Sequence, residues 1–203
     1  MNTRHAKTLA AALVVFAAGA APATPPFEVN PAGLRKAQYM EALMFGRGQV
    51  GGPFELTDQN GARRALEDFR GRLVLLYFGY TFCPDVCPSD LLTLKAMLEL
   101  HPGELQVVFV TLDPERDTPA QLAAYLPSFD PRIVGLTGTA QEVRTVAQRY
   151  KAYYAKVPIK GSDTYLIDHG AGIYLLDREG RFRGSFPAGA SVELMASVLK
   201  DFL

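Results

Sequence analysis

Residues 77–90 constrain the fold more than any other stretch of this 203-residue chain. They contain its two cysteines, Cys83 and Cys87. The apolar run 73–78 precedes them and is typical of a buried strand, and residues 89–100 follow with the pattern of a helix. We therefore expect both sulfurs at a helix N-terminus, where the helix dipole favours a thiolate over a thiol.

The spacing of Cys83 and Cys87 suits either a shared metal ion or a redox-active disulfide. Positions i and i+4 of a helix share a face, with Cβ atoms about 5–6 Å apart. Two thiolates so placed can converge on a soft metal ion, or close into a disulfide after a modest adjustment. A purely structural disulfide is less favoured, because a disulfide that closes so short a loop stabilises the folded state by only about 2 kcal/mol. Pro84 and Pro88 indicate a turn and a helix start, which argues against two inert core cysteines.

The composition fits one globular domain with additional terminal segments. Apolar residues make up 48% of the chain, enough for a substantial core. The 21 basic and 21 acidic residues cancel, and no long run of one sign occurs. This balance argues against nucleic acid or an anionic membrane surface as the main partner.

Residues 1–24 have the layout of a secretory signal peptide. Arg4 and Lys7 supply the basic part, residues 9–21 the apolar part, and small residues crowd 17–23. The apolar run is shorter than the roughly 17–25 residues of a spanning helix, although an uncleaved anchor that includes the flanks stays open. We expect an exported protein, either released or tethered by its N-terminus.

Residues 25–52 are rich in proline, glycine and alanine, and we expect a linker there with a short helix over 34–45. The compact domain is expected over residues 53–203. Its first element is predicted to be a hairpin, because Asn60-Gly61 is a strong turn signal.

Strands and helices then alternate along the domain. Capping boxes at Thr118–Gln121 and Thr139–Glu142 mark two helix starts, and residues 156–168 are expected to form a loop. The expected strands are 73–78, 106–112, 133–136, 172–176 and 181–186, and the expected helices are 89–100, 119–126, 140–154 and 191–203. This order predicts an α/β sandwich with a central mixed sheet, helices on both faces and an N-terminal hairpin. A dithiol between the first core strand and its helix makes the arrangement thioredoxin-like.

His169 is the candidate third ligand among the three histidines. His5 lies in the export signal, and His101 ends the first core helix, where we expect it to be solvated or to interact with the helix dipole. His169 directly precedes the strand 172–176. Two thiolates and an imidazole suit Cu(I), or Cu(II) with an added oxygen donor, whereas structural zinc prefers four protein ligands.

Acidic residues near these candidates have two readings. Asp168 can orient His169, and Asp85 lies between the cysteines, but either carboxylate can equally be solvated. The run that holds Asp113, Glu115 and Asp117 suggests a hard-metal site, yet a turn into a capped helix explains most of it without a metal.

Three motifs, in this order along the chain, resemble those of the Sco/SenC copper metallochaperones. They are the Cys83–Cys87 stretch from Phe78 to Pro88, the run from Thr111 to Pro119, and Asp168-His169 before a strand. The resemblance covers about residues 50–203. One departure is Gly170, where the family commonly has serine, and a second is an apolar N-terminal run shorter than a typical anchor.

The resemblance implies a thioredoxin-like fold with copper bound by Cys83, Cys87 and His169. It also implies delivery of that copper to the dinuclear copper centre of cytochrome c oxidase during assembly. The expected partners are the copper-bearing subunit of the apo-oxidase and another copper chaperone. The expected location is the bacterial periplasm, with or without a tether to the inner membrane.

The alternative function is that of a thiol–disulfide oxidoreductase. In this reading Cys83 attacks and Cys87 resolves, and the client is the pair of copper-ligand cysteines of the oxidase. The spacing argues against it, since thioredoxin-type enzymes have two residues between their cysteines rather than three. A thiol peroxidase finds little support beyond the shared fold.

Overall fold

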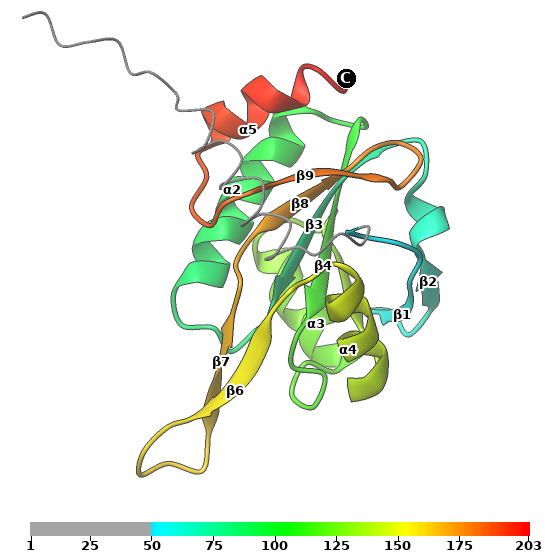
Figure 1. Cartoon of the computed structure of the whole chain (residues 1–203). Coiled ribbons are helices and arrows are strands. Elements are labelled where there is room, and N and C mark those ends of the chain that lie inside the picture. Colours follow the sequence, from blue (N-terminus) through cyan, green and yellow to red (C-terminus); the bar gives the residue numbers. More distant parts are fainter. Residues whose placement is uncertain (1–49) are drawn as a thin grey trace, which may run out of the picture. The chain divides into compact units, whose positions relative to one another are not determined.

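The computed structural model describes residues 50–203 (Figure 1). The predicted signal peptide or anchor at 1–24, the predicted helix at 34–45 and nearly all of the predicted linker at 25–52 lie outside these residues. Gly51, at the end of the predicted linker, donates its backbone N–H to the carbonyl of Arg149 at 2.9 Å. Within the described part, no helix has both the length and the apolar character that crossing a membrane requires.

A seven-stranded sheet lies at the centre of the domain in the order β2-β1-β5-β4-β3-β8-β9. The two pairs β3–β4 and β4–β5 are parallel, and the other neighbours are antiparallel. The strands are β1 (Glu55–Asp58), β2 (Arg63–Ala65), β3 (Leu73–Gly79), β4 (Leu105–Thr111), β5 (Val134–Thr137), β8 (Ile173–Leu176) and β9 (Phe182–Phe186). The predicted mixed sheet and the N-terminal hairpin β1–β2 are confirmed.

Strands β3 and β4 are buried at every residue. A parallel pair becomes this apolar when helices cover both of its faces. On one face of β3, the ring of Phe78 packs against Tyr150 and Tyr174, with centroids 5.8 and 5.6 Å away. On the other face, Tyr77 packs against Phe109 with centroids 6.1 Å apart. The end of β3 is thus held rigidly inside the core.

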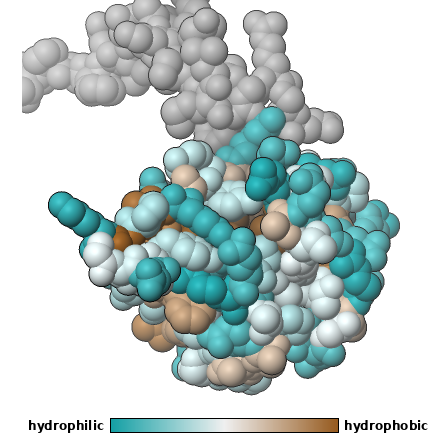
Figure 2. All heavy atoms as spheres, turned by 90° about the horizontal axis from the view of Figure 1, so that it is seen from below, coloured by the Kyte–Doolittle hydropathy of each residue, from teal (hydrophilic) through white to brown (hydrophobic). Residues whose placement is uncertain are grey.

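The helices cover both faces of the sheet, as predicted (Figure 1). Helix α2 (Val86–Leu100) packs with α5 (Val192–Leu199). Helix α4 (Ala140–Arg149) lies near β1, and Tyr150, the residue that follows it, packs against Phe78. The remaining helical elements are α3 (Pro119–Tyr125) and the short 3-10 helices η1 (Leu66–Phe69) and η2 (Leu126–Ser128). The surface seen in Figure 2 is mainly hydrophilic, with hydrophobic side chains in separate small areas.

The two predicted capping boxes have different outcomes. At α4, Thr139 and Glu142 exchange both bonds, with Glu142 N–H donating to Thr139 Oγ1 at 3.2 Å and Thr139 N–H to Glu142 Oε2 at 2.7 Å. At α3, Thr118 accepts from Gln121 N–H, but the Gln121 amide donates to Thr81 Oγ1 at 3.1 Å instead of closing the box. The helix starts where it was expected, but the Gln121 side chain bonds to the loop after β3 rather than to the helix N-terminus.

The prediction of a loop at residues 156–168 is wrong. Strands β6 (Tyr154–Pro158) and β7 (Tyr165–His169) form an antiparallel hairpin that is a separate two-stranded sheet. The predicted helix to residue 154 is also too long, because Lys151 adopts a left-handed conformation with φ of 56°. That turn ends α4 and releases the chain into β6.

Helix α2 begins at Val86, three positions before the predicted start at residue 89. Pro88 therefore sits inside the first turn, where its missing N–H has no carbonyl to bond in any case. The earlier start places Cys87 within the helix and leaves Cys83 in the loop that precedes it. The two cysteines thus belong to different local structures.

We predict that Gly79→Ala destabilises the domain, because a Cβ at this position would meet packed core atoms. It would lie 2.9 Å from ring atoms of Tyr77 and Phe109 and 3.2 Å from the Cys87 sulfur. Overpacking of this kind costs about 1–3 kcal/mol in the free energy of unfolding, measured by urea denaturation. The matched control is Gly184→Ala in β9, where an added Cβ meets nothing within 4 Å. An equal loss in both variants would contradict this packing argument.

Candidate metal centre

The loop between β3 and α2 brings two sulfurs together at the end of the most buried strand. Cys87 lies in the first turn of α2 with no exposed surface, whereas Cys83 in the loop is half-buried. Asp85 occupies the N-cap position but makes no side-chain capping bond. The Cys83 sulfur instead lies 3.4 Å from the backbone nitrogen of Cys87 and accepts its N–H. A sulfur therefore replaces the usual oxygen acceptor at this helix start.

His169 reaches the sulfurs from the last position of β7. Its Nε2 lies 3.6 Å from the sulfur of Cys87, although 82 positions separate them in the chain. Its Nδ1 lies 3.3 Å from the carbonyl oxygen of Gly170. With the proton on Nδ1, that carbonyl accepts a hydrogen bond and Nε2 presents its lone pair to the sulfurs. The ring also packs edge-on against Tyr80, with centroids 5.9 Å apart.

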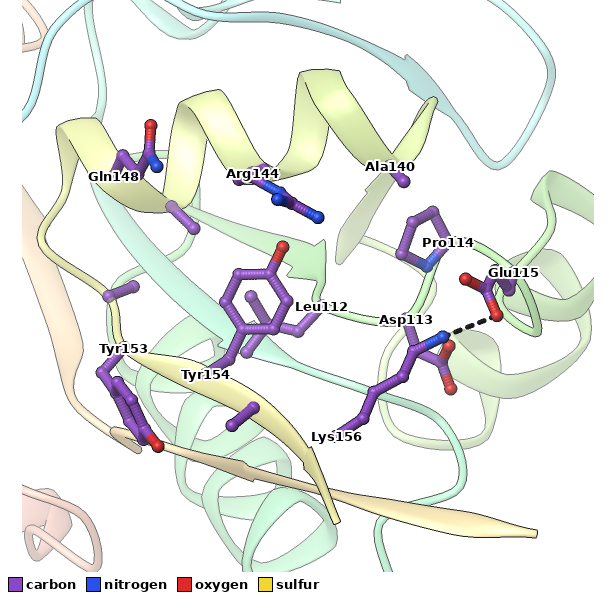
Figure 3. A pocket seen from close by; sticks show the side chains of 13 residues that line it. Leu112, Asp113, Pro114, Glu115, Ala140, Arg144, Gln148, Tyr153, Tyr154 and Lys156 are labelled. Carbon is purple, nitrogen blue, oxygen red and sulfur yellow. Dashed lines mark hydrogen bonds and ion pairs between the residues drawn. The ribbon is translucent and has the colours of Figure 1, made fainter. Parts of the chain in front are cut away.

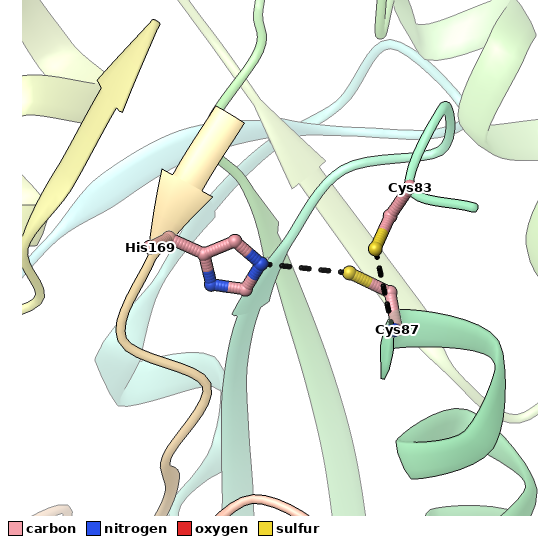
Figure 4. A group of neighbouring side chains, drawn as sticks. All are labelled: Cys83, Cys87 and His169. Carbon is pink, nitrogen blue, oxygen red and sulfur yellow. Dashed lines mark hydrogen bonds between the residues drawn. The ribbon is translucent and has the colours of Figure 1, made fainter. Parts of the chain in front are cut away.

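Cys83, Cys87 and His169 form a metal-binding geometry (Figure 4). One ligand atom from each residue lies within 4.8 Å of the other two, and the cysteines are not joined in a disulfide. Ligand atoms about 2.0–2.3 Å from one ion are separated by about 3.3–4.0 Å. Small side-chain movements thus suffice to close the three atoms around a single ion.

Burial sets the protonation of this site. Burial raises the pKa of Cys87 to about 12, and the nearby Cys83 adds to the effect. The expectation that the helix dipole yields a thiolate is therefore wrong for Cys87 in the metal-free protein. Burial also lowers the pKa of His169, against the opposing effects of the Gly170 carbonyl and the Asp168 charge. The imidazole is neutral at neutral pH, which is the form that binds metals.

The two carboxylates expected to support the ligands are both exposed. Asp168 acts on His169 through its charge, while the hydrogen-bond partner of the ring is Gly170. Asp85 lies at the N-cap of α2, between the cysteines. Their role in orienting the ligands stays a prediction.

Sequence reasoning missed two buried polar groups beside Cys87. One carboxylate oxygen of Asp90 accepts from the N–H of Gly189 at 3.1 Å, and the other has no hydrogen-bond partner among the described residues. The hydroxyl of Tyr77 likewise lacks a partner there, and it faces both Cys87 and Asp90. Helical periodicity could have found Asp90, because it follows Cys87 by three positions and lies on the same face.

The acidic run after β4 builds structure, as its turn-and-cap interpretation predicted. The buried carboxylate of Asp117 accepts from Thr81 N–H at 3.0 Å, from Thr81 Oγ1 at 2.6 Å and from Thr111 Oγ1 at 2.6 Å. Asp113 pairs with Arg116, and Glu115 pairs with Lys156 at 2.6 Å. Asp117 thus ties the loop that carries Cys83 to the end of β4.

A cavity of about 630 Å³ lies between α4, β6 and the turn after β4 (Figure 3). The ion pair between Glu115 and Lys156 spans one end of it, and Tyr154 forms part of its wall. Its lining includes none of the three candidate ligands. The cavity is therefore separate from the metal-binding geometry, although Tyr154 pairs with His169 across the hairpin.

Comparison with known proteins decides the family. Residues 44–203 match the pattern of the SCO1/SenC family. The chain belongs to this family. Its resemblance to the Sco/SenC proteins, inferred from three motifs, is confirmed, and so is the thioredoxin-like fold that the family shares.

Relatives of this SCO1/SenC protein occur in mitochondria and bacteria. It is 43% identical over 165 residues to the mitochondrial SCO2 homolog of Bos taurus, covering 78% of this chain and 61% of that protein. It is 39% identical over 157 residues to an SCO2-like protein of Rickettsia prowazekii, covering 75% and 77% of the two chains. The chain thus spans less than two thirds of the length of the bovine relative.

Solved Sco structures share the architecture. The structure of Bradyrhizobium japonicum ScoI with copper bound has 43% sequence identity and a TM-score of 0.70, and the match covers 76% of this chain and 99% of that one. The yeast Sco1 structure with copper bound has 36% identity and a TM-score of 0.68, with coverage of 77% and 91%.

We predict that Asp117→Asn destabilises the domain by about 1–3 kcal/mol in the free energy of unfolding. An amide supplies one acceptor oxygen where the carboxylate supplies two, and the fixed Thr81 N–H or a threonine hydroxyl then faces an NH2 group. Urea denaturation of the reduced protein measures the loss. The control Asp163→Asn, at an exposed position of the hairpin tip, should change the value by less than about 0.5 kcal/mol. Equal effects would contradict the anchoring role.

Proposed function

We propose that this protein binds one copper ion through Cys83, Cys87 and His169 and delivers it to the dinuclear copper centre of cytochrome c oxidase during assembly. The observation that carries the proposal is the meeting of two sulfurs and one imidazole nitrogen within 4.8 Å in a member of the SCO1/SenC family. Copper-bound structures of ScoI and yeast Sco1, at 43% and 36% identity, support the choice of metal.

The chemistry of the donors also favours copper. Thiolates and imidazole are soft or intermediate ligands that bind Cu(I) well in three-coordinate sites, and Cu(II) with an added oxygen donor. Structural zinc sites have four protein ligands, whereas the metal-binding group found in the described residues has three. A three-ligand site keeps one side open to incoming ligands.

Transfer requires that one ligand be reachable from outside. Cys83 is half-buried while Cys87 is fully buried, so an incoming thiolate or imidazole of the partner approaches from the Cys83 side. Phe82 and Val86 flank this side with 50% and 40% of their surfaces exposed. Exposed apolar side chains beside the cargo support a protein acceptor, for which we propose the copper-bearing subunit of the oxidase. We propose a second copper chaperone as the donor.

We propose that the protein works after export, in the bacterial periplasm, released or tethered through residues 1–24. The signal-like layout of that segment supports export.

A second candidate function, thiol–disulfide exchange, is favoured by one observation. The cysteines are free, and the accessible Cys83 sulfur already lies 3.4 Å from the backbone nitrogen of Cys87 at the helix start. In this reaction Cys83 attacks a client disulfide, Cys87 resolves the mixed disulfide, and the dithiol is oxidised as the client is reduced by two electrons. The natural client is the pair of oxidase cysteines that bind copper.

His169→Ala separates the two functions. We expect the reduced wild-type protein to bind one Cu(I) and the variant to bind it at least tenfold more weakly, because one of three ligands is lost. Disulfide formation should continue in the variant, since both sulfurs remain. Copper per protein after competition with a Cu(I) chelator measures the first effect, and thiol titration the second. The matched control is His101→Ala at the far end of α2, which should bind copper as the wild type does.

Delivery is tested by mixing the copper-loaded protein with the metal-free copper-bearing subunit of the oxidase. Copper should be found on the subunit after the two proteins are separated. If His169→Ala binds copper as tightly as the wild type and has lost disulfide exchange, the oxidoreductase function replaces the chaperone function. If copper stays on the loaded protein, delivery is excluded.

Copper affinity should rise with pH. Burial raises the pKa of Cys87 to about 12, so binding displaces a proton from this thiol throughout the range from pH 6 to 8. His169 is already neutral above its usual pKa and releases no proton there. The apparent affinity should therefore increase at least about tenfold per pH unit, measured by chelator competition at several pH values. An affinity independent of pH would mean that Cys87 is not a ligand.

A further inference from the structure

Arg116 lies where three segments of the domain meet. Its Nε pairs with the carboxylate of Asp113, in the turn after β4. Its Nη1 donates to the carbonyl oxygen of Tyr165 at 3.1 Å and to Thr164 Oγ1 at 3.3 Å, both on the β6–β7 hairpin. The third segment is the loop after β3, which Arg116 contacts through Phe82.

The guanidinium of Arg116 lies against two aromatic rings. Its Cζ is 3.9 Å from the ring centroid of Tyr165 and 4.7 Å from that of Phe82. The remaining Nη2 is buried and has no hydrogen-bond partner among the described residues. A planar cation shielded from water in this way interacts strongly with ring faces. Arg116 therefore joins its two aromatic neighbours directly.

Those two neighbours adjoin the candidate ligands. Phe82 directly precedes Cys83 in the chain. Tyr165 begins the strand that His169 ends. The Arg116 guanidinium thus contacts one residue next to Cys83 and another on the same strand as His169.

The hairpin needs external contacts to hold its orientation. It is a two-stranded sheet separate from the main sheet, and such hairpins are marginal alone. The turn after β4 supplies polar contacts, including the Tyr165 hydroxyl to Asp113 at 2.7 Å and Lys156 to Glu115 at 2.6 Å. Arg116 belongs to this turn and also reaches the ring beside Cys83.

We propose that Arg116 is a positioning residue that fixes the hairpin carrying His169 against the loop carrying Cys83. The inference rests on the proposed function, because the site it positions is the proposed copper site. Without Arg116, Cys87 stays in the first turn of α2 while the imidazole shifts with the hairpin. The site then becomes a pair of sulfurs without a fixed nitrogen ligand.

Arg116→Lys is the most informative variant, because it keeps the positive charge and removes the planar guanidinium group with its several N–H donors. An ammonium cannot pair with Asp113, reach the Tyr165 carbonyl and contact two aromatic rings at once. Phe82→Ala is the second variant, since it removes one ring at a position that is 50% exposed and does not threaten folding. Arg178→Lys is the control, at a half-buried arginine that pairs with Glu104 and lies away from the candidate ligands.

The first readout uses the reduced, metal-free, full-length protein and needs no copper. Because the Tyr80 ring lies edge-on to the imidazole, we expect its ring current to shift the NMR resonances of the His169 imidazole protons away from free-histidine values. We expect these resonances to move toward free-histidine values in Arg116→Lys and, by a smaller amount, in Phe82→Ala. They should stay in place in Arg178→Lys, and the His101 resonances should stay in place in all three variants. Unchanged His169 resonances in both test variants would overturn the proposal.

The second readout is a double-mutant comparison of copper affinity. Arg116→Lys should weaken copper binding at least threefold in the wild-type background and by less than twofold when His169→Ala is already present. A residue that acts through His169 has no further effect once that ligand is gone. The same loss in both backgrounds would overturn the proposal. If the wild type binds no copper, the proposed function fails, and the imidazole resonances still decide the role of Arg116.

Discussion

The contact between the Cys87 sulfur and the His169 imidazole joins the two sheets of this protein. It spans 3.6 Å between a fully buried cysteine on the central scaffold and a histidine on the separate hairpin. Cys87 is held by a strand and a helix that are packed from both sides, and Gly79 leaves the space for its sulfur. His169 is held by a small sheet that depends on its neighbours. The site therefore combines one rigid ligand with one adjustable ligand.

This division would suit the proposed function, in which the site both holds and releases a metal ion. Asp117 accepts two hydrogen bonds from Thr81, in the loop before Cys83, and one from Thr111 at the end of β4, and these bonds hold the sulfur side of the site in place. The hairpin side relies on the turn from Asp113 to Arg116, whose contacts are mostly part-buried or exposed. Rigid scaffolds position ligands, and less stable elements supply the motion.

Much of the scaffold could be predicted from the sequence, because local signals agreed with one another. The buried strand before Cys83, the turn at Asn60-Gly61 and the capping box at Thr139 each had a clear pattern, and each is present. The fold followed from the order of these elements. The candidate ligands were found by chemistry and by elimination among few cysteines and histidines, rather than from any local signal at His169.

The missed features depend on contacts between distant residues. The hairpin of β6 and β7 carries no clear strand pattern in the sequence, because most of its residues are exposed and its position is supported by the turn around Asp113. Lys151 ends α4 in a conformation that sequence reasoning assigns to glycine or asparagine. The pKa of Cys87 depends on burial, which outweighs the local dipole that the sequence indicates. The role inferred for Arg116 likewise requires three segments to be in place.

The sulfur of Cys83 also serves as the acceptor for the first turn of α2. A bond that this sulfur forms, to a metal ion or to another sulfur, changes the electron density on the sulfur and with it the strength of the hydrogen bond from the Cys87 N–H. The hydrogen bonding at the first turn of α2 therefore depends on what is bound to the Cys83 sulfur. Helix α2 runs on to Leu100 and packs with α5, so the hydrogen bond at its first turn lies on an element that extends to the far side of the domain.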